Sequence, residues 1–232
     1  MSNIQLHILC EGETEQRFAK EVLGPWLRPE EIYVKPVVLN AFRGKGRTGG
    51  VSKFCKMEQD VAILLRQYRD KGADRHLFTT MIDYYAIPND VPGYEESQGI
   101  QDARARVAFL EKEFGAYFDN PRLVPYIQLH EFEALLYTDI LLLEEDYPKS
   151  INALRALKED TDKIGDVEMI NSGYDTAPCR RIIRAVEDDY RYNKVQTGAK
   201  VTNAIGMERL LENCRHFREW VESLQDTARR LR

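Results

Sequence analysis

The chain has 232 residues, enough to bury one sizeable hydrophobic core, with room for a small helical addition. Hydrophobic residues make up 43% and charged residues 31% of it, which is typical of a folded globular protein and not of a disordered chain. No apolar run approaches the roughly 18 residues that span a bilayer, and the first ten residues lack the basic start of a secretory signal. We therefore expect a cytoplasmic protein that does not contact the membrane.

Charge is distributed unevenly around a net value of -5. Residues 40–75 carry nine Lys and Arg against four Asp and Glu, and residues 180–232 carry twelve against eight. Residues 76–179 carry eight against twenty. A basic flank beside an acidic centre suits an enzyme that holds a phosphate chain and uses cations, although solvated helix faces give similar counts.

Strands and helices are expected to alternate in the first part of the chain. Short apolar runs predict strands, and apolar residues at steps of three and four predict helices. The expected strands are residues 4–10, 32–39, 76–82 and 123–128, and the expected helices are residues 14–28, 54–72 and 98–118. This alternation favours an α/β fold with a mainly parallel sheet that helices cover on both faces.

Beyond Glu131 the pattern becomes helical. The expected helices are residues 132–143, 151–158, 178–190, 202–213 and 216–232. We predict an α/β domain over residues 1–145 and a helical C-terminal cap over residues 146–232 that packs on the sheet, with one continuous domain as the alternative. The stripe of His216, Phe217 and Trp220 is expected in the core, as are the four scattered cysteines, which include no C-x-x-C pair.

Acidic residues follow three of the expected strands: Glu11 after the first, Asp83 after the third, and Glu131 and Glu133 after the fourth. The carboxyl ends of parallel strands meet at one edge of a sheet, so these side chains are expected to lie close together. Glu15, four residues after Glu11, can turn toward the same edge. Crowded carboxylates repel one another unless protons or a cation neutralise them, and oxygen ligands select Mg²⁺ or Mn²⁺. The alternative is a set of ordinary solvated carboxylates.

The segment from His130 to Glu133 has two possible geometries. An extended start sends Glu131 and Glu133 to one side, whereas a helical start separates them by about 200°. His130 can bind phosphate, or it can be a hydrogen-bonded structural group. Tyr84 and Tyr85 can stack on bases or serve only as packing.

Basic side chains that can neutralise phosphate occur in two regions. A glycine-rich segment carries the first group, Arg43, Lys45 and Arg47; the second group is Arg180, Arg181, Lys194 and Lys200. A surface loop and solvated helix ends are the alternative interpretations.

Four motifs resemble a known family. Leu9–Glu15 contains the E-G-x-T-E signature of TOPRIM-like domains, and the chain resembles the DUF4276 family of bacterial proteins through three further segments: residues 81–93, residues 128–136, and residues 214–217 with Trp220. This resemblance implies a TOPRIM-like fold related to overcoming-lysogenization-defect nucleases, with divalent metal at the acids of the first and third strands.

The resemblance implies site residues as well. Glu11 and Glu15 match the paired glutamates of the nuclease branch, and Asp83 matches the first acid of its D-x-D motif. Tyr85 stands where the second acid is expected, so two-metal binding requires Asp90, Glu131 or Glu133 as a replacement.

The leading hypothesis is an Mg²⁺- or Mn²⁺-dependent nuclease, with Glu11, Glu15, Asp83, Glu131 and Glu133 as catalytic candidates. The resemblance also implies an effector of a bacterial defence module that works beside a separate AAA- or ABC-type ATPase. The chain has no G-x-x-x-x-G-K-[ST] motif of its own. Two alternatives are a TOPRIM-like module that binds nucleic acid or nucleotide without cutting it, and a subunit whose cap docks onto the ATPase.

Overall fold

The sheet has the parallel arrangement that the sequence predicts. The computed structural model describes residues 2–39, 53–171 and 174–232. The strands are β1 (Asn3–Cys10), β2 (Ile32–Val38), β3 (Asp74–Asp83), β4 (Leu123–Val124) and β5 (Ile127–Gln128). Their order is β2-β1-β3-β4, β5 also pairs with β3, and every one of these pairings is parallel. Because Cys10 lies opposite Met81, β1 and β3 reach the same edge of the sheet, where Glu11 follows β1 and Asp83 ends β3.

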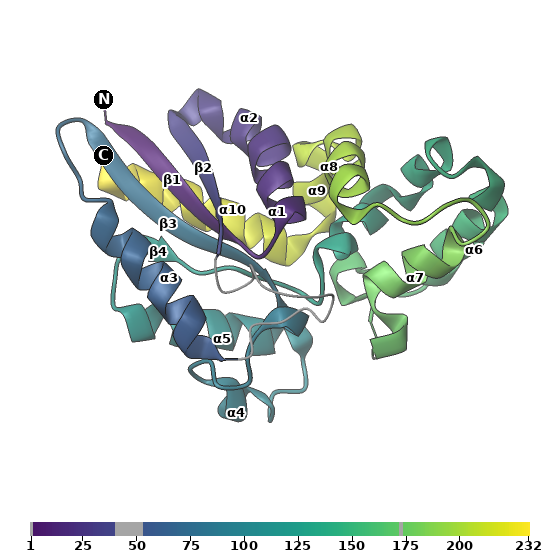
Figure 1. Ribbon diagram of the computed structural model, residues 1–232, viewed down its shortest axis with the longest axis horizontal. Helices are drawn as coiled ribbons and strands as arrows, with labels where there is room; N and C mark the ends of the chain where they lie inside the picture. The colour runs from purple at the N-terminus through teal and green to yellow at the C-terminus, as the bar shows by residue number, and fades with distance from the viewer. Residues whose placement is uncertain (1, 40–52, 172–173) are drawn as a thin grey trace.

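Helices cover both faces of this sheet (Figure 1). Alternate β1 residues such as Leu6 and Ile8 pack in one core with the α1 and α10 helices, whereas Leu9 packs in a second core with α3 and α5. The first face carries α1 (Glu13–Phe18), the π-helical turn η1 (Ala19–Leu23), α2 (Gly24–Leu27), η2 (Arg28–Glu30) and α10 (Arg215–Leu231). The second face carries α3 (Phe54–Gln67) and α5 (Ala103–Phe118); η4 (Tyr84–Ala86) and α4 (Tyr94–Ser97) lie between β3 and α5 in the chain.

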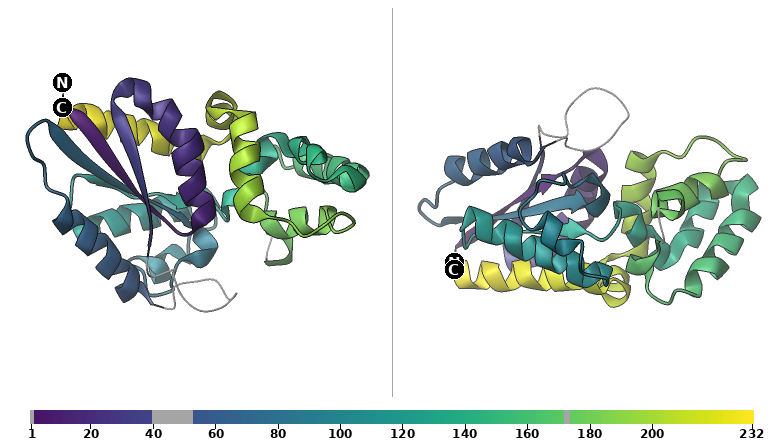
Figure 2. Two further views of the ribbon diagram at one scale, coloured as in Figure 1. Left: turned by 45° about the horizontal axis from the view of Figure 1, so that its top comes forward. Right: turned by 90° about the horizontal axis from the view of Figure 1, so that it is seen from below.

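The remaining helices form a lobe at the carboxyl end of the sheet. They are η5 (Phe132–Glu145, with a kink at Asp139), η6 (Pro148–Ser150), α6 (Ile151–Asp162), η7 (Val167–Met169), η8 (Tyr174–Thr176), α7 (Pro178–Ala185), α8 (Lys194–Ile205) and α9 (Met207–Asn213). In both views of Figure 2, α6 and α7 lie beyond α8 on the side away from the sheet. The proposed boundary at residue 146 stays a prediction.

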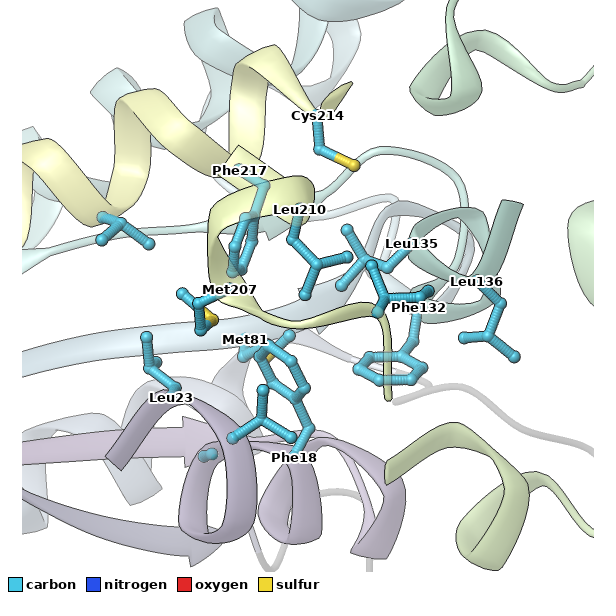
Figure 3. Close-up of a cluster of buried hydrophobic side chains, with 14 of the residues drawn as sticks. Phe18, Leu23, Met81, Phe132, Leu135, Leu136, Met207, Leu210, Cys214 and Phe217 are labelled. Carbon is cyan, nitrogen blue, oxygen red and sulfur yellow. The ribbon is translucent and has the colours of Figure 1, made fainter. Parts of the chain in front are cut away.

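A buried cluster ties this lobe to the sheet. Figure 3 shows Phe18 of α1 and Met81 of β3 beside Phe132 of η5 and Phe217 of α10. The ring of Phe18 meets the ring of Phe132 edge-on at 5.4 Å and that of Phe217 at 5.9 Å. This packing fixes the start of η5, and with it the residues on either side of Phe132.

Several predicted boundaries were wrong for local reasons. The fourth expected strand is split into β4 and β5 at Pro125, which has no N–H to donate. The hydroxyl of Thr80 bridges this gap by accepting from the N–H of Tyr126 and donating to its carbonyl, each at 2.8 Å. The helix expected from residue 98 begins at Ala103, because the Asp102 side chain caps it through the N–H of Ala105.

Two further expectations need correction. The helix expected over residues 202–213 is two helices, α8 and α9, because Gly206 between them adopts a φ of 82°. Cys10 and Cys214 are buried as predicted, whereas Cys55 is exposed on α3. His216, Phe217 and Trp220 lie in the core as expected.

Among the described helices, none is long and apolar enough to cross a membrane.

Candidate functional site

Glu11 and Asp83 are joined at the edge of the sheet. The backbone N–H of Asp83 donates to Oε2 of Glu11 at 3.0 Å, so the carboxylate after β1 touches the residue that ends β3. The Asp83 carboxylate in turn accepts the N–H of Phe132 at 2.8 Å. The ends of β1 and β3 and the start of η5 therefore form one hydrogen-bonded unit around two acidic side chains.

Glu15 is held beside this unit by the start of α1. Its Oε2 accepts the N–H of Gly12 at 2.8 Å, the backward bond of a capping box. The same bond gives Glu15 a structural role and also turns its carboxylate back toward the end of β1. Its side chain is buried, so the helix start presents a carboxylate inside the protein.

Glu133 and Lys194 complete the cluster. Glu133 is fully buried, and its Oε2 lies 3.0 Å from Nζ of Lys194, which is 3.7 Å from Oδ2 of Asp83. Lys194 is the first residue of α8, where the Asn193 side chain caps the helix by accepting the N–H of Gln196. Neither oxygen of Glu133 has a partner with hydrogen-bond geometry in the part of the chain that the structure describes. We call Glu11, Glu15, Asp83, Glu133 and Lys194 the acidic cluster.

The acidic cluster has more negative than positive groups, and burial shifts the pKa values of its carboxyl groups upward. Burial, and then the charge of Glu15, raise the pKa of Glu11 to about 7. Burial likewise raises the pKa of Glu15 and of Asp83, against the opposing influence of Lys194. Burial alone lowers the pKa of Lys194, but the charges of Glu133, Asp83 and Glu15 outweigh it and raise this pKa well above the ordinary value. Lys194 therefore remains an ammonium group.

Glu131 lies next to the acidic cluster. It has an extended backbone before η5, the geometry that sends Glu131 and Glu133 to the same side. Oε2 of Glu131 accepts the N–H of Cys179 near the start of α7 at 2.9 Å. Potential ligand atoms of Glu131, Glu133 and Cys179 lie within 4.8 Å of one another, which no other three acidic, His or Cys side chains do in the described residues. Burial raises the pKa of the Cys179 thiol, so the donors at neutral pH are carboxylate oxygens.

The comparisons with known proteins identify a family. A family model for a domain of unknown function, DUF4276, matches residues 10–225, nearly the whole chain. The chain belongs to the DUF4276 family. No curated protein and no solved structure matches it.

Other predicted ligands of this DUF4276 protein have structural contacts instead. Asp90 caps α3 by accepting the N–H of Phe54 at 2.7 Å. Lys200 pairs with Asp146 at 2.5 Å and with Glu145 at 3.3 Å on an exposed face of the lobe. Arg181 donates to the carbonyl of Thr176 at 2.9 Å. These three side chains have partners away from the acidic cluster.

The other phosphate-binding candidates of the DUF4276 chain have different surroundings. Arg43, Lys45 and Arg47 lie outside the described residues. Arg180 is exposed on α7 near Glu131. Burial raises the pKa of Glu131, and the charge of Arg180 opposes this shift. Burial, and then Arg106, lower the pKa of His130 to about 4. His130 is therefore a neutral hydrogen-bonding group near neutral pH, and its Nδ1 lies 3.3 Å from Nδ2 of Asn171.

The two tyrosines of the family motif differ in exposure. Tyr84 packs against the second core, as the packing interpretation expects. Tyr85 is 42% exposed, with its ring centroid 5.7 Å from that of His130. Tyr85 therefore leaves an aromatic ring at the surface, next to the segment that carries Glu131 and Glu133.

Two features of the DUF4276 site were not expected from the sequence. Lys194 was expected to neutralise phosphate, whereas it already pairs with two carboxylates of its own chain. Cys179 was expected in the core and is only half-buried, and Tyr192 had no assigned role; both line a hollow of about 390 Å³ that Lys194 also borders. The run Tyr190-Arg191-Tyr192 before the helix start was the available signal for such a surface.

Proposed function

We propose that this chain is an Mg²⁺- or Mn²⁺-dependent phosphodiesterase that cuts nucleic acid, with the acidic cluster as its active site. The observation that carries the proposal is the charge of the cluster. The cluster holds four carboxylates and one ammonium group, which pairs with two of them, so a fully ionised cluster has a net charge of -3. Such a charge in a buried place is costly unless a cation or protons reduce it.

The residues fit a hard divalent cation. Oε1 of the fully buried Glu133 has no partner among the described residues, and Oε2 has only its ion pair with Lys194, so Oε1 is a candidate metal ligand. Glu133 shares the Lys194 ammonium with Asp83, and its carboxylate lies within 4.8 Å of that of Glu131. Glu133 and Glu131, whose carboxylate oxygens lie within 4.8 Å of each other, would hold the ion, and Asp83 and Glu11 would complete the ligand set after their carboxylates move closer. When bound, the ion would supply Lewis-acid stabilisation of phosphate and lower the pKa of water.

The protein's own groups have separate tasks. Lys194 is 36% exposed on its side chain, so its ammonium can face both the carboxylates and a phosphate oxygen from solvent. The N–H of Asp83 and the N–H of Phe132 orient the carboxylates of Glu11 and Asp83. Without a metal, Glu11 has a pKa of about 7, so partial protonation at neutral pH lowers the negative charge of the cluster.

The family resemblance supports the same proposal. The E-G-x-T-E motif over Glu11–Glu15 resembles that of TOPRIM-like nucleases, and the second acid of D-x-D is replaced here by Tyr85. The position of Glu133 beside the Asp83 ion pair supports Glu133 as the substitute acid. A defence role beside a separate ATPase is part of the proposal and rests on the resemblance alone.

A cleavage assay tests this function. Purified protein is incubated with plasmid DNA, single-stranded DNA and RNA in Mg²⁺ or Mn²⁺, with and without EDTA. The proposal expects metal-dependent cleavage that Asp83→Asn and Glu133→Gln abolish. Glu13→Gln is the matched control, because Glu13 is exposed and lies in the same motif as Glu11 and Glu15. Cleavage that survives both cluster variants contradicts the assignment of the active site.

A second function has one observation in its favour. The Lys194 ammonium pairs with both Asp83 and Glu133. A binding module without metal needs such a positive charge to neutralise part of the cluster. Such a module binds nucleic acid or nucleotide with equal affinity in EDTA and in Mg²⁺, and it cuts nothing. The same assay combined with a binding titration therefore separates the two functions.

A further inference from the structure

A hollow in the helical lobe opens beside the acidic cluster. It measures about 390 Å³ and is lined by Cys179, Ile183, Glu187, Tyr190, Arg191, Tyr192 and Lys194. A second hollow of about 400 Å³ shares Arg191, Tyr192 and Lys194 with it. Lys194 therefore links these hollows to the acidic cluster, and we call the first of them the lobe cleft.

The walls of the lobe cleft are apolar and exposed. Ile183 of α7 is 42% exposed and Tyr190 is 59% exposed, which places both among the few large hydrophobic side chains at the described surface. The Tyr190 ring is held in place, because its hydroxyl donates to the carbonyl of Asp146 at 2.5 Å and its ring lies 5.1 Å from that of Tyr147. A fixed aromatic ring beside an aliphatic side chain offers a flat ligand two apolar surfaces.

Polar groups lie at the rim and at the floor. Arg191 is exposed and has no ion pair within the described residues, so its guanidinium is available to an anion. Tyr192 is only 9% exposed, and its hydroxyl has no hydrogen-bond partner in the part of the chain that the structure covers. Leaving a buried hydroxyl unpaired is unfavourable, and a small shift of the cleft wall that exposes this hydroxyl to a polar ligand edge would relieve it.

We propose that the lobe cleft binds one nucleobase of a single-stranded nucleic acid, with the attached phosphate directed toward Arg191 and Lys194. The volume suits a single nucleotide, the walls suit a base, and the cations suit its phosphate. Glu187 is the one carboxylate among the lining residues, and it can accept from an exocyclic amino group of a base. This inference rests on the proposed function, because it names the substrate strand of the same site.

Binding without cleavage is the test. Single-stranded oligonucleotides that carry 2-aminopurine are titrated with the protein in EDTA, and quenching of the fluorescent base reports stacking against the cleft. Ile183→Asp and Tyr192→Phe are each expected to weaken binding about tenfold. The control is Ile63→Asp, at an exposed position of α3, which is expected to leave binding unchanged. Tyr192→Phe removes only the unpaired hydroxyl, so its melting temperature is expected to stay at or above that of the parent.

The outcomes separate this inference from the proposed function. Loss of quenching in both cleft variants supports the base site even when no cleavage is seen in the assay with Mg²⁺. Equal quenching in the parent and in both folded cleft variants overturns the base site, whatever the cleavage assay shows. Tight binding of a free nucleoside monophosphate, with no binding of the oligonucleotide, overturns the assignment to a strand.

Discussion

The backbone N–H of Asp83 lies 3.0 Å from Oε2 of Glu11, which binds the carboxylate after the first strand to the residue that ends the third. This bond orients Glu11 through a backbone group, so it survives a change of the Asp83 side chain. A variant at Asp83 can therefore remove charge from the acidic cluster without dismantling it.

Asp83→Asn is expected to abolish function and keep the fold. The amide oxygen of Asn can still accept the N–H of Phe132, and the loss of one buried charge relieves repulsion among the carboxylates. We expect a melting temperature equal to or above that of the parent and a fall in cleavage rate of about 100-fold or more. Calorimetry and the plasmid assay measure the two effects, and a cleavage rate close to that of the parent contradicts the role of Asp83.

Lys194→Met is expected to destabilise the protein through the carboxylates that it leaves unpaired. Removing one partner of a buried ion pair lowers the free energy of unfolding by about 3–5 kcal/mol. Because Lys194 is partly exposed and solvent screens its charge, we expect a loss of about 3 kcal/mol or less. Chemical denaturation measures this difference. Lys200→Met is the matched control, because Lys200 is exposed and pairs with half-buried Asp146 and exposed Glu145, so its loss is expected to cost less than about 1 kcal/mol.

The two lysine variants also differ in their response to metal. Mg²⁺ can restore positive charge to the acidic cluster, so we expect it to raise the melting temperature of Lys194→Met more than that of Lys200→Met. Equal shifts in the two variants indicate that the cation binds elsewhere.

Two glycines within helices predict opposite effects of alanine. A Cβ added at Gly198 of α8 would lie 2.9 Å from Cγ2 of Thr14 and 3.0 Å from the Phe132 ring. Gly198→Ala therefore forces α8, which begins at Lys194, away from α1, at a cost of about 1–3 kcal/mol in unfolding free energy, and it is expected to reduce cleavage.

At Gly115 of α5 the atoms nearest to an added Cβ belong to Pro125, at 3.5 and 3.6 Å. Gly115→Ala is expected to stabilise the protein by about 0.5–1 kcal/mol in the same denaturation experiment.

His7 predicts a pH dependence of stability that is independent of the acidic cluster. Burial, and then the charge of His76, lower the pKa of His7 from 6.5 to about 4, while its ring packs against Tyr68 and Phe78. Between these pKa values the unfolded chain binds a proton that the folded chain does not, so stability is lost as the pH falls from about 6.5 to 4. At 1.36 kcal/mol for each pKa unit, the loss of unfolding free energy is about 3 kcal/mol.

His7→Phe checks this sign directly. The variant keeps an aromatic ring between Tyr68 and Phe78 but cannot take up a proton. The difference in unfolding free energy between parent and variant is expected to shrink or reverse toward pH 4. A difference that stays constant from pH 7 to pH 4 contradicts the depressed pKa of His7.

The sequence predicted the parts of the fold that depend on local periodicity. Apolar strands alternating with amphipathic helices indicated the parallel sheet, and the same topology placed Glu11 and Asp83 at one edge. Interruptions such as Pro125 and Gly206 were underestimated, because the surrounding apolar pattern continues through both of them. Glu133 could not be distinguished from Glu131, since that choice depends on the extended backbone at Glu131.

Long-range partners were beyond the reach of sequence patterns. Lys194 lies 111 positions after Asp83 and 61 after Glu133, and no periodicity connects the first residue of α8 with the end of β3. The packing of Gly198 against Thr14 and Phe132 brings that helix to the site. Tyr192 and Ile183 likewise acquire a shared surface only through the fold of the lobe.

The proposed metal site is tested most directly by a calorimetric titration of Mg²⁺ and Mn²⁺ into the protein without nucleic acid, because this measures metal binding separately from cleavage. We expect binding to the parent and to Glu13→Gln, and loss of that binding in Asp83→Asn and Glu133→Gln. No binding to the parent, or the same affinity in Asp83→Asn as in the parent, contradicts the claim that the acidic cluster is a metal site.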